Sequence, residues 1–166
     1  MIYISQIELP DTFVSDVISG FNTYQHAIET WEETDLIRIN DIFTRETDPF
    51  LYDKLVELSL RVQSLVAHDV KYKSFFNVEV VRYPTSSAKQ FHFDYPNPNK
   101  TAASITYLND NYIGGQTVID GVSVQPLSGR TVYFTGQDHR HCVMNVVKGC
   151  RYTLSIWYGH DEGYSI

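Results

Sequence analysis

Two short histidine-containing segments stand out in the second half of the chain. The first is Phe91-His92-Phe93-Asp94-Tyr95, and the second is His139-Arg140-His141. On a β-strand, side chains two residues apart share a face, so we expect His92 and Asp94 to point in the same direction. An imidazole and a carboxylate then converge on one point. Because a His-x-Asp triplet also occurs often by chance, its context has to decide whether it binds a ligand.

The second segment can supply a third metal ligand. Two histidines and one carboxylate around a pocket, with other coordination positions left open, form the facial triad of non-haem Fe(II) oxygenases. On this interpretation His92, Asp94 and His141 bind Fe(II). A three-histidine zinc or cupin-type site is the alternative, because His139 and His141 also share a face and can act with His92. Residue types alone leave both alternatives open.

A basic residue just beyond this segment points to a co-substrate. Oxygenases of this kind need a molecule that chelates the metal, and the dicarboxylate 2-oxoglutarate also needs a fixed cation for its far carboxylate. Arginine suits that task, because its planar fork binds a carboxylate through two parallel hydrogen bonds. Arg151 is the candidate, and Thr153 on the same strand face can add a hydroxyl donor. The alternative is an inward arginine neutralised by a structural Asp or Glu.

Strand register decides whether His141 and Arg151 face one site. We expect residues 140–146 and 150–158 to form a hairpin with a three-residue loop that ends at Gly149 in a left-handed conformation. In that register both side chains point inward, about 13 Å apart along the strand direction. A two-residue turn would place them on opposite faces and break the site.

Sequence periodicity predicts the elements that must position these residues. Apolar residues at helical spacing predict a short helix near residues 11–21 and a longer one from Asp48 and Pro49 to about residue 67. From residue 76 the period changes to two, and strand-like runs are expected at 76–83, 89–95, 102–108, 116–119, 122–125, 130–134, 140–147 and 150–158.

These elements predict a mainly β (α+β) fold. No alternation of strands and helices points to a parallel sheet, so we expect an antiparallel sandwich or jelly roll with both helices on one outer face. The length of 166 residues predicts a single domain, 1–166. Within it, residues 1–75 are the expected helical N-terminal support and residues 76–158 the jelly-roll catalytic core.

Composition restricts the partners and the location. No apolar run approaches the ~20 residues of a membrane span, so no membrane partner is expected. A net charge of −7 counts against a protein whose main task is to bind nucleic acid. The two cysteines, Cys142 and Cys150, form no disulfide framework, and the N-terminus has no signal-peptide pattern. We therefore expect a cytoplasmic protein. No oligomeric state follows from the sequence.

Residues 79–158 resemble the catalytic core of the prolyl 4-hydroxylase-like branch of the 2-oxoglutarate- and Fe(II)-dependent dioxygenases. The motifs that carry this resemblance occur in the family's order; they are Val80-Val81-Arg82-Tyr83, His92-Phe93-Asp94, Tyr107-Leu108-Asn109-Asp110, Gly114-Gly115-Gln116-Thr117, Val124-Gln125-Pro126-Leu127-Ser128-Gly129-Arg130, and His141 with Val146, Gly149 and Arg151. The family's fold is a double-stranded β-helix, or jelly roll, which agrees with the strand pattern.

The resemblance implies the same metal triad and assigns Arg151 to the C5 carboxylate of 2-oxoglutarate. Tyr83 and Tyr107 would offer hydroxyl groups near the co-substrate, although each can also be a core aromatic whose hydroxyl bonds a backbone carbonyl. The pattern favours His141 over His139 as the distal ligand, because Val146, Gly149 and Arg151 fix its register and because Asp94 would otherwise have no role. His139 is then expected beside the site.

The activity that the resemblance implies is hydroxylation of a substrate C–H bond. Fe(II) is the cofactor, 2-oxoglutarate and O2 are the co-substrates, succinate and CO2 are released, and ascorbate is an expected stimulant. A carboxylate ligand, Asp94, favours hydroxylation over halogenation. The branch favours a prolyl or related side chain in a peptide or protein as the substrate. A free amino acid or small-molecule metabolite, and a cupin-like metal-binding module without this activity, are the alternatives.

Overall fold

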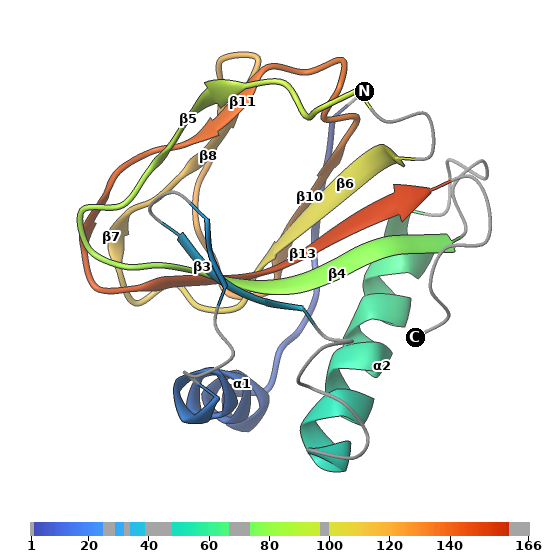
Figure 1. Ribbon diagram of the computed structural model, residues 1–166, viewed down its shortest axis with the longest axis vertical. Helices are drawn as coiled ribbons and strands as arrows, with labels where there is room; N and C mark the ends of the chain where they lie inside the picture. The colour runs from blue at the N-terminus through green and yellow to red at the C-terminus, as the bar shows by residue number, and fades with distance from the viewer. Residues whose placement is uncertain are drawn as a thin grey trace.

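Antiparallel sheets and two helices form the described part of the computed structural model, which comprises residues 2–24, 29–31, 34–38, 48–66, 74–96 and 100–159 (Figure 1). The helices are α1 (Asp11–Thr23) and α2 (Pro49–Val66). The strands are β1 (Tyr3–Gln6), β2 (Glu29–Trp31), β3 (Thr34–Arg38), β4 (Ser74–Tyr83), β5 (Lys89–His92), β6 (Lys100–Tyr107), β7 (Ile113–Gly114), β8 (Thr117–Ile119), β9 (Val122–Val124), β10 (Arg130–Phe134), β11 (His141–Val143), β12 (Val146–Lys148) and β13 (Arg151–Gly159).

The strands form two facing walls. The major sheet has the order β1-β10-β6-β13-β4-β3-β2, and the minor sheet has the order β5-β11-β8-β9. Figure 1 shows β5, β11 and β8 on one side and β10, β6, β13 and β4 on the other, while β12 pairs separately with β7. This arrangement confirms the predicted jelly roll. No helix among the described residues is long and apolar enough to span a membrane.

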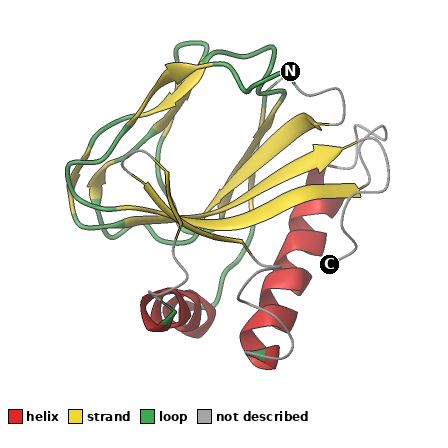
Figure 2. Cartoon of the chain, in the orientation of Figure 1, coloured by secondary structure: helices red, strands yellow, loops and turns green. Residues whose placement is uncertain are grey.

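Strand β13 separates the helix-packed core from the space between the sheets. Its even-numbered residues join the apolar cluster that also contains the buried side chains of both helices; they are Tyr152, Leu154, Ile156 and Tyr158. Because side chains alternate along a strand, Arg151, Thr153 and Ser155 point to the opposite face, toward the minor sheet. Both helices lie on the outer face of the major sheet, as predicted (Figure 2).

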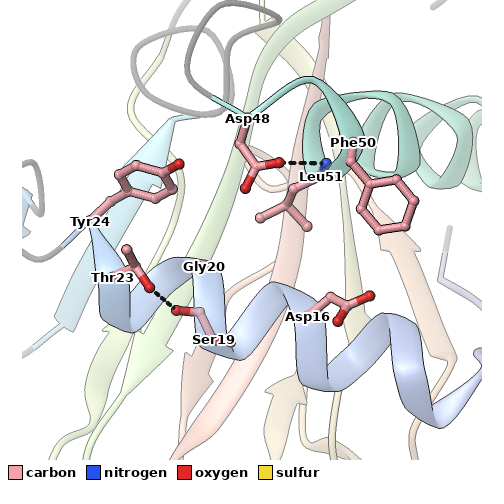
Figure 3. Close-up of a pocket in the computed structure, with 8 residues that line it drawn as sticks. All are labelled: Asp16, Ser19, Gly20, Thr23, Tyr24, Asp48, Phe50 and Leu51. Carbon is pink, nitrogen blue, oxygen red and sulfur yellow. Dashed lines mark hydrogen bonds between the residues drawn. The ribbon is translucent and has the colours of Figure 1, made fainter.

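The two helices form where the apolar periodicity predicts them. In α1, Phe13, Val17 and Phe21 are buried at intervals of four residues. Asp48 caps α2, because its Oδ1 accepts a hydrogen bond of 3.0 Å from the backbone N–H of Leu51 (Figure 3). The residues drawn in Figure 3 line a hollow between the two helices. Its volume is about 230 Å³. The described residues place no group of metal-binding side chains there.

The predicted hairpin of residues 140–146 and 150–158 does not form, so that prediction was wrong. β11 pairs with β5 and β8 in the minor sheet, whereas β13 pairs with β4 and β6 in the major sheet. The predicted strand 140–147 is interrupted after Val143, and β12 then pairs with β7. Gly149 does have a left-handed φ of +87°, because the chain reverses there before entering the major sheet.

The N-terminal part of the chain contributes strands as well as helices. β1 pairs with β10 at one edge of the major sheet, and β3 pairs with β4 toward the other edge. All four residues of β1 are exposed. The strand has no buried face, so the sequence could not show it as alternating buried and exposed residues. The division of the domain at residue 75 stays a prediction.

Replacement of Asp48 by Ala should lower the free energy of unfolding by about 1 kcal/mol, because the N–H of Leu51 loses its partner. Chemical denaturation followed by circular dichroism measures this change. Glu57→Ala removes the same charge from an exposed position of α2 and should change stability by less than about 0.5 kcal/mol. Equal effects of the two variants would contradict the capping role.

Candidate active site

The predicted metal ligands come together between the two sheets. One ligand atom from each of His92, Asp94 and His141 lies within 4.8 Å of the others. His92 and His141 are directly opposed in the β5–β11 pairing, and their ring centroids are 4.2 Å apart. Asp94 Oδ1 lies 3.6 Å from His141 Nε2. Within the described ranges of the chain, no other such cluster of His, Cys, Asp and Glu occurs.

Backbone carbonyls hold both imidazole rings in the orientation that a metal needs. His92 Nδ1 donates to the carbonyl of Gln90 at 2.7 Å, and His141 Nδ1 donates to that of His139 at 2.9 Å. A carbonyl oxygen can only accept, so the proton lies on Nδ1 and the lone pair of each Nε2 points toward the site. Burial lowers the pKa of His141, which favours the neutral, metal-binding form.

Asp94 lies beyond the end of β5 and is positioned by the loop after β10. Its backbone N–H donates to the carbonyl of Gly136 at 2.9 Å. The Cα of Gly136 also lies so close to the Asp94 carboxylate that a Cβ at position 136 would overlap it. The glycine therefore leaves room for the third ligand. Phe134 packs edge-on against the His141 ring, with 4.7 Å between the ring centroids.

His139 lies beside the triad and is held by a different partner. Its Nδ1 lies 2.6 Å from Asp120 Oδ2, and the N–H of Arg140 donates to the other oxygen of the same carboxylate at 3.0 Å. The hydrogen bond from His139 lowers the pKa of Asp120. The described residues thus group His141, and not His139, with His92 and Asp94.

Arg151 is buried, with 1% of the residue exposed. The rings of Tyr83 and Tyr107 lie against it, with centroids 4.6 and 5.2 Å from Cζ. Its Nη2 donates to Thr117 Oγ1 at 3.1 Å, but Nε and Nη1 have no partner. No acidic side chain among the described residues forms an ion pair with it. For the described part of the chain, this excludes the alternative that a structural Asp or Glu neutralises Arg151.

The residues predicted to accompany Arg151 are near it but differ in what they offer. Thr153 follows on the same face, and its buried Oγ1 has no partner. The Tyr107 hydroxyl instead lies 2.8 Å from Thr117 Oγ1 and accepts from the Thr117 N–H at 2.9 Å. Its role as a hydroxyl donor to the co-substrate stays a prediction, as does that of Tyr83, which lines the cavity beside the metal ligands.

A cavity of about 400 Å³ opens in front of the triad. Its walls include Phe93, Tyr95 and Trp157, and the sequence analysis did not assign Phe93 or Trp157 to the site. The predicted strand alternation pointed Phe93 and Tyr95 away, but β5 ends at His92, so the alternation does not extend to them. Cys142, in contrast, is a buried free thiol and lines no part of this cavity.

The donor set fits the group that the sequence predicts. Two imidazole nitrogens and one carboxylate oxygen, with one side left open, suit Fe(II). Arg151 Nε, Arg151 Nη1 and Thr153 Oγ1 are buried donors that have no partner, and a buried guanidinium is stable only when it is paired. An anion such as the carboxylate of 2-oxoglutarate would satisfy all three.

Comparison with protein families matches residues 78–159 to the 2OG-Fe(II) oxygenase superfamily. The matched segment begins in β4, ends with β13 and contains every residue of the triad and Arg151. The chain belongs to this superfamily, whose members are dioxygenases that use Fe(II), 2-oxoglutarate and O2. A comparison with curated proteins finds no match.

Solved structures of prolyl hydroxylases share the fold. A Pseudomonas putida prolyl-4-hydroxylase has a TM-score of 0.72 at 19% identity, over 97% of this chain and 93% of that one. A Trichoplax adhaerens prolyl hydroxylase, in complex with a hypoxia inducible factor oxygen degradation domain peptide fragment, has a TM-score of 0.76 at 20% identity, over 96% and 83%. The viral collagen prolyl hydroxylase of Paramecium Bursaria Chlorella virus-1, in a 2OG complex, has a TM-score of 0.67 at 16% identity, over 96% and 97%. Identities this low establish the fold alone.

Replacement of Gly136 by Ala should weaken metal binding by about 10- to 100-fold, because the added methyl group displaces the Asp94 carboxylate. The fold should persist, since the atoms that must move belong to one side chain. Titration with Mn(II) by calorimetry gives the affinity, and thermal melting checks the fold. Thr135→Ala, one residue earlier in the loop, should bind metal normally. Unchanged affinity of the Gly136 variant would refute this positioning role.

Alanine substitution should also separate the two neighbouring histidines. His141→Ala should lose metal, because only His92 and Asp94 remain, whereas His139→Ala should retain it. Metal content after anaerobic reconstitution with Fe(II) and desalting distinguishes the variants. The reverse result would favour the three-histidine site.

Proposed function

We propose that this protein is a prolyl 4-hydroxylase-like hydroxylase that oxidises a prolyl or related side chain of a peptide or protein in the cytoplasm. One observation carries the proposal: the buried donors of Arg151 that lack a partner lie in the same interior as an open two-histidine, one-carboxylate triad. A metal-binding module that binds no co-substrate would contain no anion to pair with the buried Arg151 guanidinium. Family membership and the shared fold support the same activity.

Each group in the site has a task in this reaction. His92, Asp94 and His141 would hold Fe(II), which supplies the centre at which O2 and 2-oxoglutarate are activated for C–H oxidation. Arg151 binds the distal carboxylate and thereby fixes the direction in which the co-substrate enters. The Tyr83 ring, packed against the guanidinium, limits its motion and excludes water from the ion pair.

The cavity opening supports a peptide or protein substrate. Its aromatic lining residues offer flat apolar surfaces for a proline ring and the adjoining chain; they are Phe93, Tyr95 and Trp157. Tyr95 is 88% exposed and stands at the mouth of the cavity. The Trichoplax adhaerens prolyl hydroxylase, which shares the fold, was solved with a peptide fragment. Two free cysteines are consistent with the reducing cytoplasm.

The deciding experiment measures succinate release from 2-oxoglutarate with and without Fe(II), in the presence of proline-containing peptides or of free amino acids. We expect Fe(II)-dependent succinate and a mass increase of about 16 Da on a prolyl residue, the mass of the single oxygen atom that hydroxylation inserts. Oxidation of a free amino acid alone would reject the peptide substrate but not the chemistry. Absence of succinate with every substrate and without substrate would reject the oxygenase activity.

Arg151→Ala adds a specific test of the co-substrate site. The apparent constant for 2-oxoglutarate should rise by about one to three orders of magnitude, because a buried charge-assisted pair is lost, while iron binding persists. Arg130→Ala is the matched control, since the Arg130 side chain donates near the surface to the carbonyl of Gln125 and, among the described residues, to no other group. Equal loss of iron in the Arg151 variant would assign Arg151 to stability of the barrel instead.

A further inference from the structure

The donors around Arg151 include one residue that the sequence analysis did not assign, Tyr112. It lies in the loop between β6 and β7, and its hydroxyl oxygen is buried with no hydrogen-bond acceptor among the described residues. The ring packs at the margin of the cluster that contains Tyr107, whose ring flanks the same guanidinium. A buried hydroxyl with no partner costs free energy, so its presence calls for an explanation.

Two glycines hold Tyr112 against Arg151. A Cβ at Gly115 would lie 3.0 Å from Tyr112 Cε2 and 3.1 Å from Arg151 Cδ, so the tyrosine ring and the arginine side chain both lie against this glycine. A Cβ at Gly149 would lie 3.0 Å from Tyr112 Cβ. Both glycines have positive φ, +66° and +87°, in the region that residues with a Cβ avoid. The backbone thus leaves space for the ring beside the Arg151 side chain, and the guanidinium is close enough to influence the hydroxyl electrostatically.

The hydroxyl is a donor in this environment. Burial raises the pKa of Tyr112 well above its ordinary value, and the nearby Arg151 guanidinium opposes this shift without cancelling it. Tyr112 therefore stays neutral and keeps its proton at physiological pH. Four buried donor atoms in and near Arg151 find no acceptor among the described residues; they are Arg151 Nε, Arg151 Nη1, Thr153 Oγ1 and Tyr112 Oη. All can donate, and a carboxylate has about four lone-pair positions to accept them.

We propose that the Tyr112 hydroxyl donates a hydrogen bond to the distal carboxylate of 2-oxoglutarate, beside Arg151 and Thr153. This inference rests on the proposed function and adds a binding residue to it. Tyr112 then contributes to the choice of a dicarboxylate co-substrate, because a 2-oxo acid that ends in a methyl group would leave the hydroxyl without a partner.

The test compares two ligands and two proteins by calorimetry on the Mn(II)-loaded protein without oxygen. 2-Oxopentanoate has the carbon chain of 2-oxoglutarate but ends in a methyl group. Tyr112→Phe keeps the ring that packs on Gly115 and Gly149 and removes only the hydroxyl. We expect this variant to bind 2-oxoglutarate about tenfold more weakly and 2-oxopentanoate as the unmodified protein does. Tyr3→Phe, on the exposed strand β1, is the control and should change neither affinity.

The possible outcomes separate this inference from the proposed function. Unchanged binding of 2-oxoglutarate by Tyr112→Phe overturns the inference and leaves the proposed function intact. Equal weakening of both ligands also overturns it, because Tyr112 would then support the fold and not the carboxylate. If the unmodified protein binds no 2-oxoglutarate while it holds Mn(II), the proposed function fails and the inference fails with it. Thermal melting shows whether the variant is folded in each case.

Discussion

The buried charge of Arg151 is the constraint on which the rest of the site depends. A guanidinium removed from water costs several kcal/mol unless other groups compensate it. Here the rings of Tyr83 and Tyr107 and the hydroxyl of Thr117 provide part of that compensation. Donors are left over, and no acidic side chain of the described residues takes them. No described residue supplies the anion that these donors require, and this open requirement connects the architecture of the barrel to the proposed binding of 2-oxoglutarate.

The two sheets supply different parts of the proposed site. The minor sheet supplies His92 and His141 from adjacent strands, whereas the major sheet supplies Arg151 and Thr153 from β13. The proposed metal ligands and the proposed co-substrate cation therefore stand on opposite walls of one interior, and we expect a small dicarboxylate to bridge them. The helices stabilise this arrangement from outside, because the other face of β13 packs in the core cluster with α1 and α2. A substitution in that core would act on the site only through the position of β13.

Close packing by glycine recurs at each critical contact. Gly136 leaves room for the Asp94 carboxylate, and Gly115 leaves room for the ring of Tyr112 beside Arg151. In both places the neighbouring atom is part of a functional side chain, so a methyl group would alter the site before it altered the fold. Catalytic geometry is thus encoded partly in residues that have no side chain and take no part in the chemistry.

The sequence by itself determined the residue types of the triad, Arg151, the capped helix after Asp48 and the alternation of the strands, because each depends on local spacing. It did not determine which strands pair. The alternation of side chains specifies which face His141 occupies, but not which strand pairs with its own. A hairpin with residues 150–158 was therefore predicted, whereas β11 pairs with β5 and β8 in the structure. Only the tertiary structure brought Tyr112 and Gly136 to the site. Their contacts join segments distant in the chain, and such contacts leave no periodic signal in the sequence.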